Sequence, residues 1–174
     1  GPAPLRIPRF PGFASLGTYR TLYICTCAVA FANAMTFSAL GPYFPAYAHD
    51  RFGCSATRIG LMMAAYPLLN LITSPCCGRL MNRFGRWNVL FAGLCLLTAA
   101  TALYGVAGSP FWLFVASGMH GASLSLVHVS SLALLSAYPD RLTEAMGGIE
   151  VWSGVALVVG PPLGGLVYPR WGVS

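Results

Sequence analysis

Five long apolar stretches, separated by short polar connectors, dominate the pattern of this chain. Each stretch has about 20 residues or more, the length that a helix needs to cross the hydrocarbon core of a bilayer. The stretches cover about residues 19–40, 59–81, 88–106, 111–137 and 144–168. The pattern predicts an all-α integral membrane protein, with a short segment at residues 1–18 and one transmembrane domain of five helices at residues 19–174.

Composition points to lipid as the surroundings of the chain. Only 8% of the 174 residues are charged and 56% are hydrophobic, whereas soluble proteins carry about 25% charged residues. A chain so poor in charge cannot cover a surface that faces water. The net charge of +6 does not indicate a nucleic-acid partner, because the cations are spread over the connectors and form no basic face.

The ten basic residues are all arginine, and their distribution predicts the orientation of the helices. Connectors on the cytoplasmic side of a membrane carry an excess of positive charge. With a cytoplasmic N-terminus, the inner side carries Arg6, Arg9, Arg20, Arg79, Arg83, Arg86 and Arg141, and the outer side carries Arg51, Arg58 and Arg170. We therefore expect a multi-pass protein with its N-terminus in the cytoplasm.

The connector between the second and third stretches, residues 78–87, has glycine and arginine in a specific order. Its characteristic residues are Gly78, Asn82, Arg83, Gly85 and Arg86. Glycine permits a tight turn between helices, and arginine anchors at the cytoplasmic headgroups. An ordinary positive connector would carry the same charge. The spacing, however, resembles the cytoplasmic loop signature of the major facilitator superfamily, which implies a role in conformational gating.

The fifth stretch carries small residues and prolines at close spacing: Gly154, Gly160, Pro161, Gly164 and Gly165. Small residues let helix backbones approach closely, so generic helix packing is one interpretation. The arrangement also resembles the fifth-helix motif of the antiporter branches of the same superfamily, which implies a pliant contact between two halves of a transporter. Because both motifs occur in the expected order on the expected helices, we favour the family resemblance.

Shorter matches resemble the vesicular amine transporter branch and its polyamine-transporting relatives. Pro42 and Pro45 enclose an aromatic pair, and Asn33 stands where that branch often has an aspartate. The resemblance implies the N-terminal part of a secondary transporter with two six-helix halves and a substrate site between them. It implies exchange of an organic cation or amine for protons, with the missing C-terminal half needed for transport. The alternative is a truncated, non-transporting membrane protein that associates with or regulates a complete transporter.

Polar side chains inside the expected helices are candidates for a substrate or proton pathway, because such groups are costly in lipid and usually face a cavity or a partner. They are Glu150, Asn33, His128, His120 and Ser117. We hypothesise that Glu150 binds a cation or a proton, with His128 or His120 as its partner. Alternatively, Glu150 caps the N-terminal end of its helix, the histidines only pack, and Asn33 bonds to a neighbouring helix.

The fourth helix departs from the family in one respect. At 100° per residue, Ser117, His120, Gly121, His128 and Ser131 share one face. Ser117 and His120 stand where many proton-coupled members of the superfamily have an arginine and a glutamine. Proton coupling through that arginine is therefore not expected here.

Enzyme and metal motifs do not occur in the sequence. It contains no Walker loop, HExxH zinc motif or GxSxG elbow. The six cysteines form no CxxC pair with partnering histidines. We therefore expect a protein that is not an enzyme and needs no cofactor or metal, and whose partners are the bilayer and a small-molecule substrate.

Overall fold

The computed structural model describes residues 16–171 of the chain, and every secondary-structure element within them is a helix. The elements are α1 Leu16–Leu40, α2 Phe44–Phe52, α3 Ala56–Phe84, α4 Arg86–Val106, α5 Pro110–Leu135, a 3-10 turn at Pro139–Arg141, and α6 Leu142–Trp171. Five of the helices, all except α2, are long and apolar enough to cross a membrane. The all-α membrane fold with five spans is therefore confirmed. Of the N-terminal segment expected at residues 1–18, residues 1–15 lie outside the described residues.

Helix α2 was not predicted, because residues 44–52 lie in what the apolar pattern indicated as a connector. Two local signals explain it. Pro45 occupies the first turn, where its fixed backbone suits a helix start, and Gly53 ends the helix with φ of 60°. Phe44 and Ala48 are buried against the neighbouring helices, so packing stabilises this short helix.

The connector expected at residues 78–87 is almost entirely helical. Helix α3 continues to Phe84, α4 starts at Arg86, and only Gly85 separates them. Gly85 has φ of 86°, a conformation that glycine adopts at little cost because it has no Cβ. Gly78 lies inside α3 and faces open space, so it does not contribute to the turn as the sequence analysis expected.

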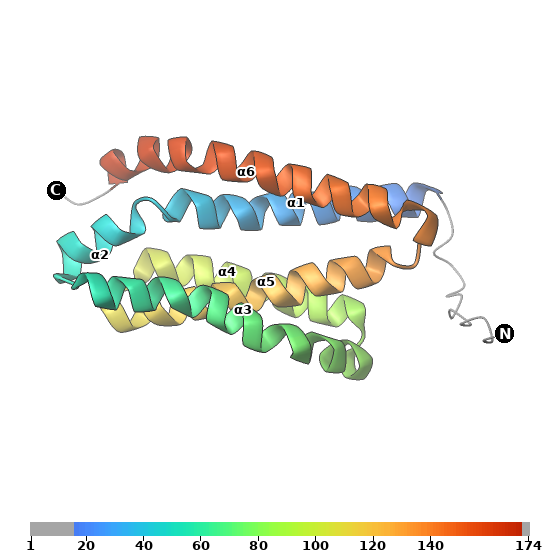
Figure 1. The fold of residues 1–174 in the computed structure, drawn as a ribbon, viewed down its shortest axis with the longest axis horizontal. Coiled ribbons are helices and arrows are strands. Elements are labelled where there is room, and N and C mark those ends of the chain that lie inside the picture. Colours follow the sequence, from blue (N-terminus) through green and yellow to red (C-terminus); the bar gives the residue numbers. More distant parts are fainter. Residues whose placement is uncertain (1–15, 172–174) are drawn as a thin grey trace.

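The five long helices form two groups (Figure 1). Helices α1 and α6 pack side by side as one pair, and α5 packs against both α3 and α4 as the second group. Direct contacts between the groups are few; most of them join α1 and α6 to α5, and the stacked rings of Phe37 and Tyr66 join α1 to α3. Along the chain, α2 connects the first group to the second at one end of the bundle (Figure 1).

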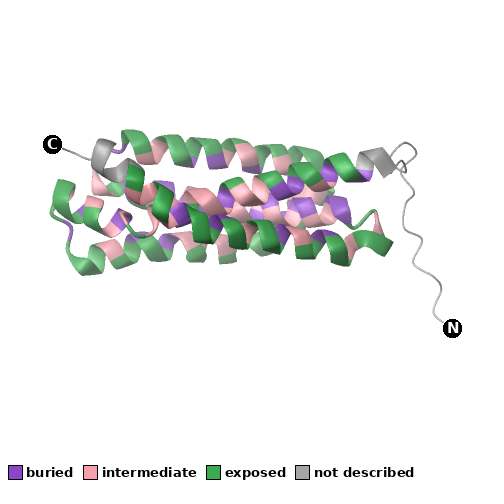
Figure 2. Cartoon of the chain, turned by 90° about the horizontal axis from the view of Figure 1, so that it is seen from above, coloured by how far each residue is buried: buried purple, intermediate pink, exposed green. Residues whose placement is uncertain are grey.

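The hydrophobic core lies in two clusters at opposite ends of the bundle. One cluster joins the start of α1, the end of α5 and the start of α6, through Leu22, Leu135 and Ile149. The other joins α2 to α3, α4 and α5, through Phe44, Met62 and Leu113 among others. Figure 2 shows that buried residues line the inside of the bundle, whereas exposed ones cover its outer faces. Those exposed faces carry large apolar side chains, as expected where lipid or other helices surround them.

Close contact between α1 and α6 depends on the glycines of the fifth-helix motif. A Cβ at Gly160 would meet Ser38 and the backbone of Ala39, and one at Gly164 would meet Ala39 and Tyr43. Hydrogen bonds reinforce the pair, since Ser38 Oγ donates to the Ala156 carbonyl at 2.9 Å and Tyr43 Oη donates to the Pro161 carbonyl at 3.2 Å. Gly165 also lies against the Tyr43 hydroxyl, whereas Gly154 faces open space. Most of this motif therefore packs α6 onto α1.

Candidate functional site

A cavity of about 510 Å³ lies between the two helix groups, with α1 and α6 on one side and α3 and α5 on the other. Its wall is mixed, with apolar side chains and uncharged polar ones, as is common for small-molecule sites. The polar or ionisable side chains that line it are Thr26, Asn33, Tyr66, Asn70, Ser74, Ser125, His128, Ser131 and Ser153. No carboxylate or guanidinium is among the described residues of this wall.

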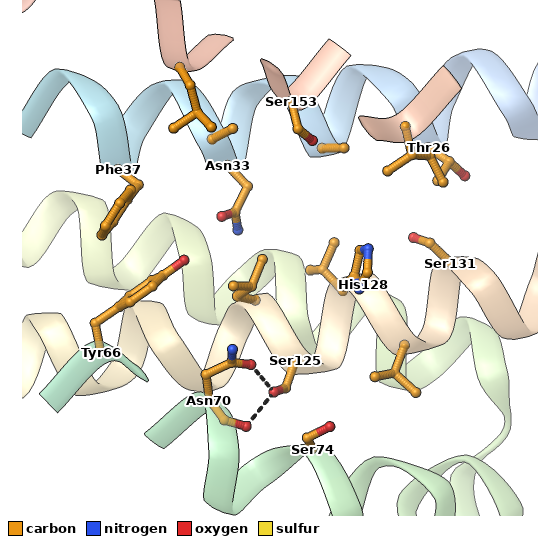
Figure 3. A pocket seen from close by; sticks show the side chains of 17 residues that line it. Thr26, Asn33, Phe37, Tyr66, Asn70, Ser74, Ser125, His128, Ser131 and Ser153 are labelled. Carbon is orange, nitrogen blue, oxygen red and sulfur yellow. Dashed lines mark hydrogen bonds between the residues drawn. The ribbon is translucent and has the colours of Figure 1, made fainter. Parts of the chain in front are cut away.

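Asn33 of α1 places a buried amide in the wall of this cavity. Its side chain is buried and points into the space between the helix groups (Figure 3), and its Nδ2 donor has no hydrogen-bond partner among the described residues. A buried donor left unpaired costs about 1–3 kcal/mol. An acceptor on a solute inside the cavity would remove that cost.

The wall formed by α3 and α5 is held by a direct polar contact. Ser125 Oγ lies 2.7 Å from the backbone carbonyl of Asn70 and also contacts the side-chain oxygen of Asn70 (Figure 3). Close to it, a Cβ at Gly121 would collide with the backbone of Tyr66, so α5 and α3 are in backbone contact. On this side of the cavity, α3 and α5 are therefore held in direct contact with each other.

One end of the cavity is aromatic. The rings of Phe37 from α1 and Tyr66 from α3 stack with their centroids 4.6 Å apart and an angle of 24° between planes. Figure 3 shows both rings at the same end of the cavity, and Thr26 and Ser131 at the other. The cavity thus offers a flat aromatic surface at one end and hydroxyl groups at the other.

Four of the five expected site residues lie in two separate places, and Glu150 lies in a third. Asn33 and His128 line the cavity, with Ser131 beside His128 on the same helix face. Ser117 and His120 are buried in a second cluster outside the cavity wall, where the Tyr104 hydroxyl donates to Ser117 Oγ at 3.0 Å. The structure does not bring these residues into one site.

Glu150 does not line the cavity. Its neighbours Ile149 and Ser153 face the cavity, but Glu150 itself is exposed on α6. No hydrogen bond or ion pair joins it to His120 or His128 among the described residues. The capping alternative is wrong, because α6 begins at Leu142 and the acid in its first turn is Glu144.

Three cavity residues that the sequence analysis did not single out lie on α3. Tyr66, Asn70 and Ser74 are polar residues at intervals of four within the second apolar stretch. Residues four apart lie on one face of a helix, and a polar stripe in a lipid-crossing helix faces a cavity or a partner. That spacing is the signal by which they could have been found.

Arg83 and Arg86 of the connector at residues 78–87 have different environments. Arg86 Nη1 donates to the backbone carbonyl of Ala133 at 2.6 Å, which ties the start of α4 to the end of α5. The guanidinium of Arg83 lies over the Phe84 ring, 5.4 Å from its centroid, and remains exposed, as does Asn82. Arg86 therefore holds α4 and α5 together, whereas Arg83 contacts the neighbouring ring of Phe84 in its own helix.

Comparison with known proteins bears on what such an arrangement does. The family model described as Major Facilitator Superfamily matches residues 26–174. The chain is 35% identical over 149 residues to the MFS-type transporter SLC18B1 of Rattus norvegicus, which is 79% of this chain and 32% of that protein. It is also 31% identical over 125 residues to the chromaffin granule amine transporter of Homo sapiens, covering 68% of this chain and 23% of that protein. The chain spans about a third of the length of the first of these relatives.

Proposed function

This chain belongs to the major facilitator superfamily, and we propose that it forms part of the substrate pathway of a secondary transporter that exchanges an organic amine for protons. The observation that carries the proposal is the cavity between the helix groups, whose wall combines the side-chain oxygens of Asn33 and Ser131 with the stacked rings of Phe37 and Tyr66. Transporters of this kind bind substrate near the midplane and move by rocking one helix bundle against another. A polar cavity at the middle of apolar helices fits that task.

The chemistry of the wall supports an amine as the bound group. An ammonium group donates hydrogen bonds, and the wall supplies acceptor oxygens from Asn33 and Ser131. It also supplies the stacked rings of Phe37 and Tyr66, and aromatic faces attract cations, most strongly where water is excluded. The relatives named as amine transporters agree with this class of substrate.

Orientation and coupling are further parts of the proposal. We propose that the N-terminus faces the cytoplasm, so that the α3–α4 turn with Arg86 lies on the cytoplasmic side. We propose that Glu150 attracts cations at the edge of the pathway, because it is exposed on α6 beside the cavity-lining residue Ser153. Replacing Glu150 with glutamine should then weaken amine binding in low salt and leave it unchanged in high salt.

Amine binding to the chain in lipid nanodiscs tests the proposal directly. Radiolabelled tyramine and spermidine would serve as probes of an aromatic monoamine and an aliphatic polyamine. Asn33→Ala should weaken binding about tenfold, which is the loss of about 1.4 kcal/mol. Asn88→Ala is the matched control, because Asn88 is an exposed amide on α4 that bonds to the Phe84 carbonyl at 2.8 Å. Equal affinities of wild type and Asn33→Ala would contradict the assignment of the site.

Transport itself calls for a separate measurement. We expect the 174-residue chain in liposomes to bind amine without carrying it, because the family fold places the substrate between two six-helix halves. Uptake driven by a proton gradient in liposomes that contain only this chain would refute that expectation. Absence of both binding and uptake would count against the amine-transport proposal as a whole.

A further inference from the structure

Five aromatic rings form a row that leads from the cavity to the end of the bundle at α2. The row is Phe37, Tyr66, His120, Tyr104 and Phe44, which come in turn from α1, α3, α5, α4 and α2. Successive ring centroids are 4.6, 5.2, 6.3 and 6.1 Å apart, so each ring contacts the next. Phe37 and Tyr66 belong to the cavity wall. The middle ring, His120, is the member of the row that can bind a proton and become positively charged.

The His120 ring is almost fully enclosed, with 1% of its surface exposed. Within the described part of the chain, its Nε2 has no hydrogen-bond partner. The nearest hydroxyl groups on its own helix are engaged elsewhere, since Ser123 bonds to the His120 backbone carbonyl and Ser117 accepts from Tyr104. An apolar ring would fill the same space without leaving a polar atom unpaired, so packing alone does not explain a histidine here.

The titratable groups that face the imidazole are Tyr66 from α3 and Tyr104 from α4, whose rings meet it edge to face at 77° and 73°. From α1 and α6, the described charged side chains are Arg20, Glu144 and Glu150, and none of them forms an ion pair or hydrogen bond with His120. A positive charge on the ring would therefore lie beside two tyrosine rings, and among the described side chains no carboxylate pairs with it.

We propose that His120 is a proton-binding site that controls the aromatic end of the cavity. The step is the transfer of one proton from a hydronium ion to the lone pair of the imidazole nitrogen Nε2, with Nδ1 carrying the other hydrogen and one water molecule released. The ring gains one positive charge and no other bond changes. Tyr66 lies between His120 and Phe37, so a change in the position of its ring changes the shape of the cavity wall.

The backbone geometry favours a movement of the Tyr66 side chain over a movement of the whole helix. Gly121, the residue after His120, lies in direct contact with the Tyr66 backbone. This contact prevents α3 and α5 from approaching further at that point. A charge that attracts the Tyr66 ring toward His120 therefore moves the ring, and with it the stacking partner of Phe37. The inference rests on the proposed function only in taking the cavity as the site where amine binds.

Nitrogen-15 NMR of labelled histidine in nanodiscs, between pH 3 and pH 8, tests the proposal on the intact chain. The three histidines, His49, His120 and His128, are assigned by replacing each with glutamine. We expect the His120 signals to titrate, and the aromatic signals of labelled Tyr66 to shift with the same midpoint. The proposal would be overturned if the His120 ring stays neutral over this range, or if the chemical shifts of Tyr66 do not change as His120 titrates.

Two variants separate the proposed role from simple packing. His120→Gln should abolish the pH-dependent shift of Tyr66, whereas His128→Gln should retain it, because the imidazole in ring contact with Tyr66 is that of His120. The titration of the wild-type chain needs no substitution, so the test stands even if His120→Gln does not fold.

Amine binding supplies an independent readout. Tyramine affinity should fall about tenfold at the pH where His120 is protonated, and this pH dependence should be lost in His120→Gln. If His120 titrates together with Tyr66 but no amine binds at any pH, the inference stands and the proposed function fails. If amine binds equally at all pH values and the His120 signals do not titrate, the proposed function stands and the inference fails.

Discussion

Replacing Gly160 with alanine tests whether the motif on α6 serves to pack this helix onto α1. The new Cβ would lie 2.9 Å from Ser38 Cβ and 3.0 Å from the Ala39 backbone nitrogen. It would also displace the Ser38 hydroxyl, which donates to the Ala156 carbonyl at 2.9 Å. Backbone atoms on α1 cannot rotate away, so the two helices must separate.

The expected loss of stability follows from three contributions. Overpacking of this kind costs about 1–3 kcal/mol, and an interhelical hydrogen bond within a membrane protein contributes about 0.6 kcal/mol. Alanine is more favourable than glycine inside a helix by about 1 kcal/mol. We therefore expect Gly160→Ala to lower the free energy of unfolding by about 0.5–2.5 kcal/mol.

Gly154→Ala is the matched control, because Gly154 lies on the same helix with open space around it. It should leave the free energy of unfolding unchanged or raise it by up to about 1 kcal/mol. Steric-trap unfolding of both variants in bicelles gives the two values under identical conditions. Equal stabilities for Gly160→Ala and Gly154→Ala would refute the packing argument.

Two further predictions concern the turn between α3 and α4. Gly85→Ala should destabilise the chain by about 1–3 kcal/mol, because φ of 86° is strained for a residue with a Cβ, whereas Gly78→Ala should not, since Gly78 is helical with free space; equal unfolding free energies for the two variants would contradict this. Arg86→Ala should raise amide hydrogen exchange at the end of α5, because it removes the bond to the Ala133 carbonyl, whereas Arg83→Ala should leave that exchange unchanged. Unaltered exchange in Arg86→Ala would show that this bond does not hold the helix ends together.

The five spans could be predicted from the sequence because lipid permits few alternatives. A helix satisfies all its own backbone groups, so a long apolar stretch is sufficient evidence for one. Exact ends were harder to predict. Gly78, Asn82 and Arg83 look like a turn in the sequence, but each is compatible with a helix exposed to solvent, and α3 includes all three. Only the backbone conformation of Gly85 decides where the turn falls.

The candidate site was predicted in part. Asn33 and His128 were chosen for their polarity inside apolar helices, and both line the cavity. Glu150 was chosen on the same ground, but polarity does not indicate the direction in which a side chain points. Ser153 and Leu157 face the cavity whereas Glu150 is exposed. The rotation of α6 about its axis depends on its contacts with α1, which no periodicity within α6 alone reveals.

The pairing of α1 with α6 also has a consequence for how the protein is made. These helices are the first and the last described elements, so α6 leaves the ribosome roughly a hundred residues after α1. At typical synthesis rates that interval is about 5–20 s. During this time Ser38 has no Ala156 carbonyl to bond, and the buried face of α1 with Thr26 and Asn33 has no partner from α6. The newly inserted first helix must therefore be sheltered by the insertion machinery until the last one arrives.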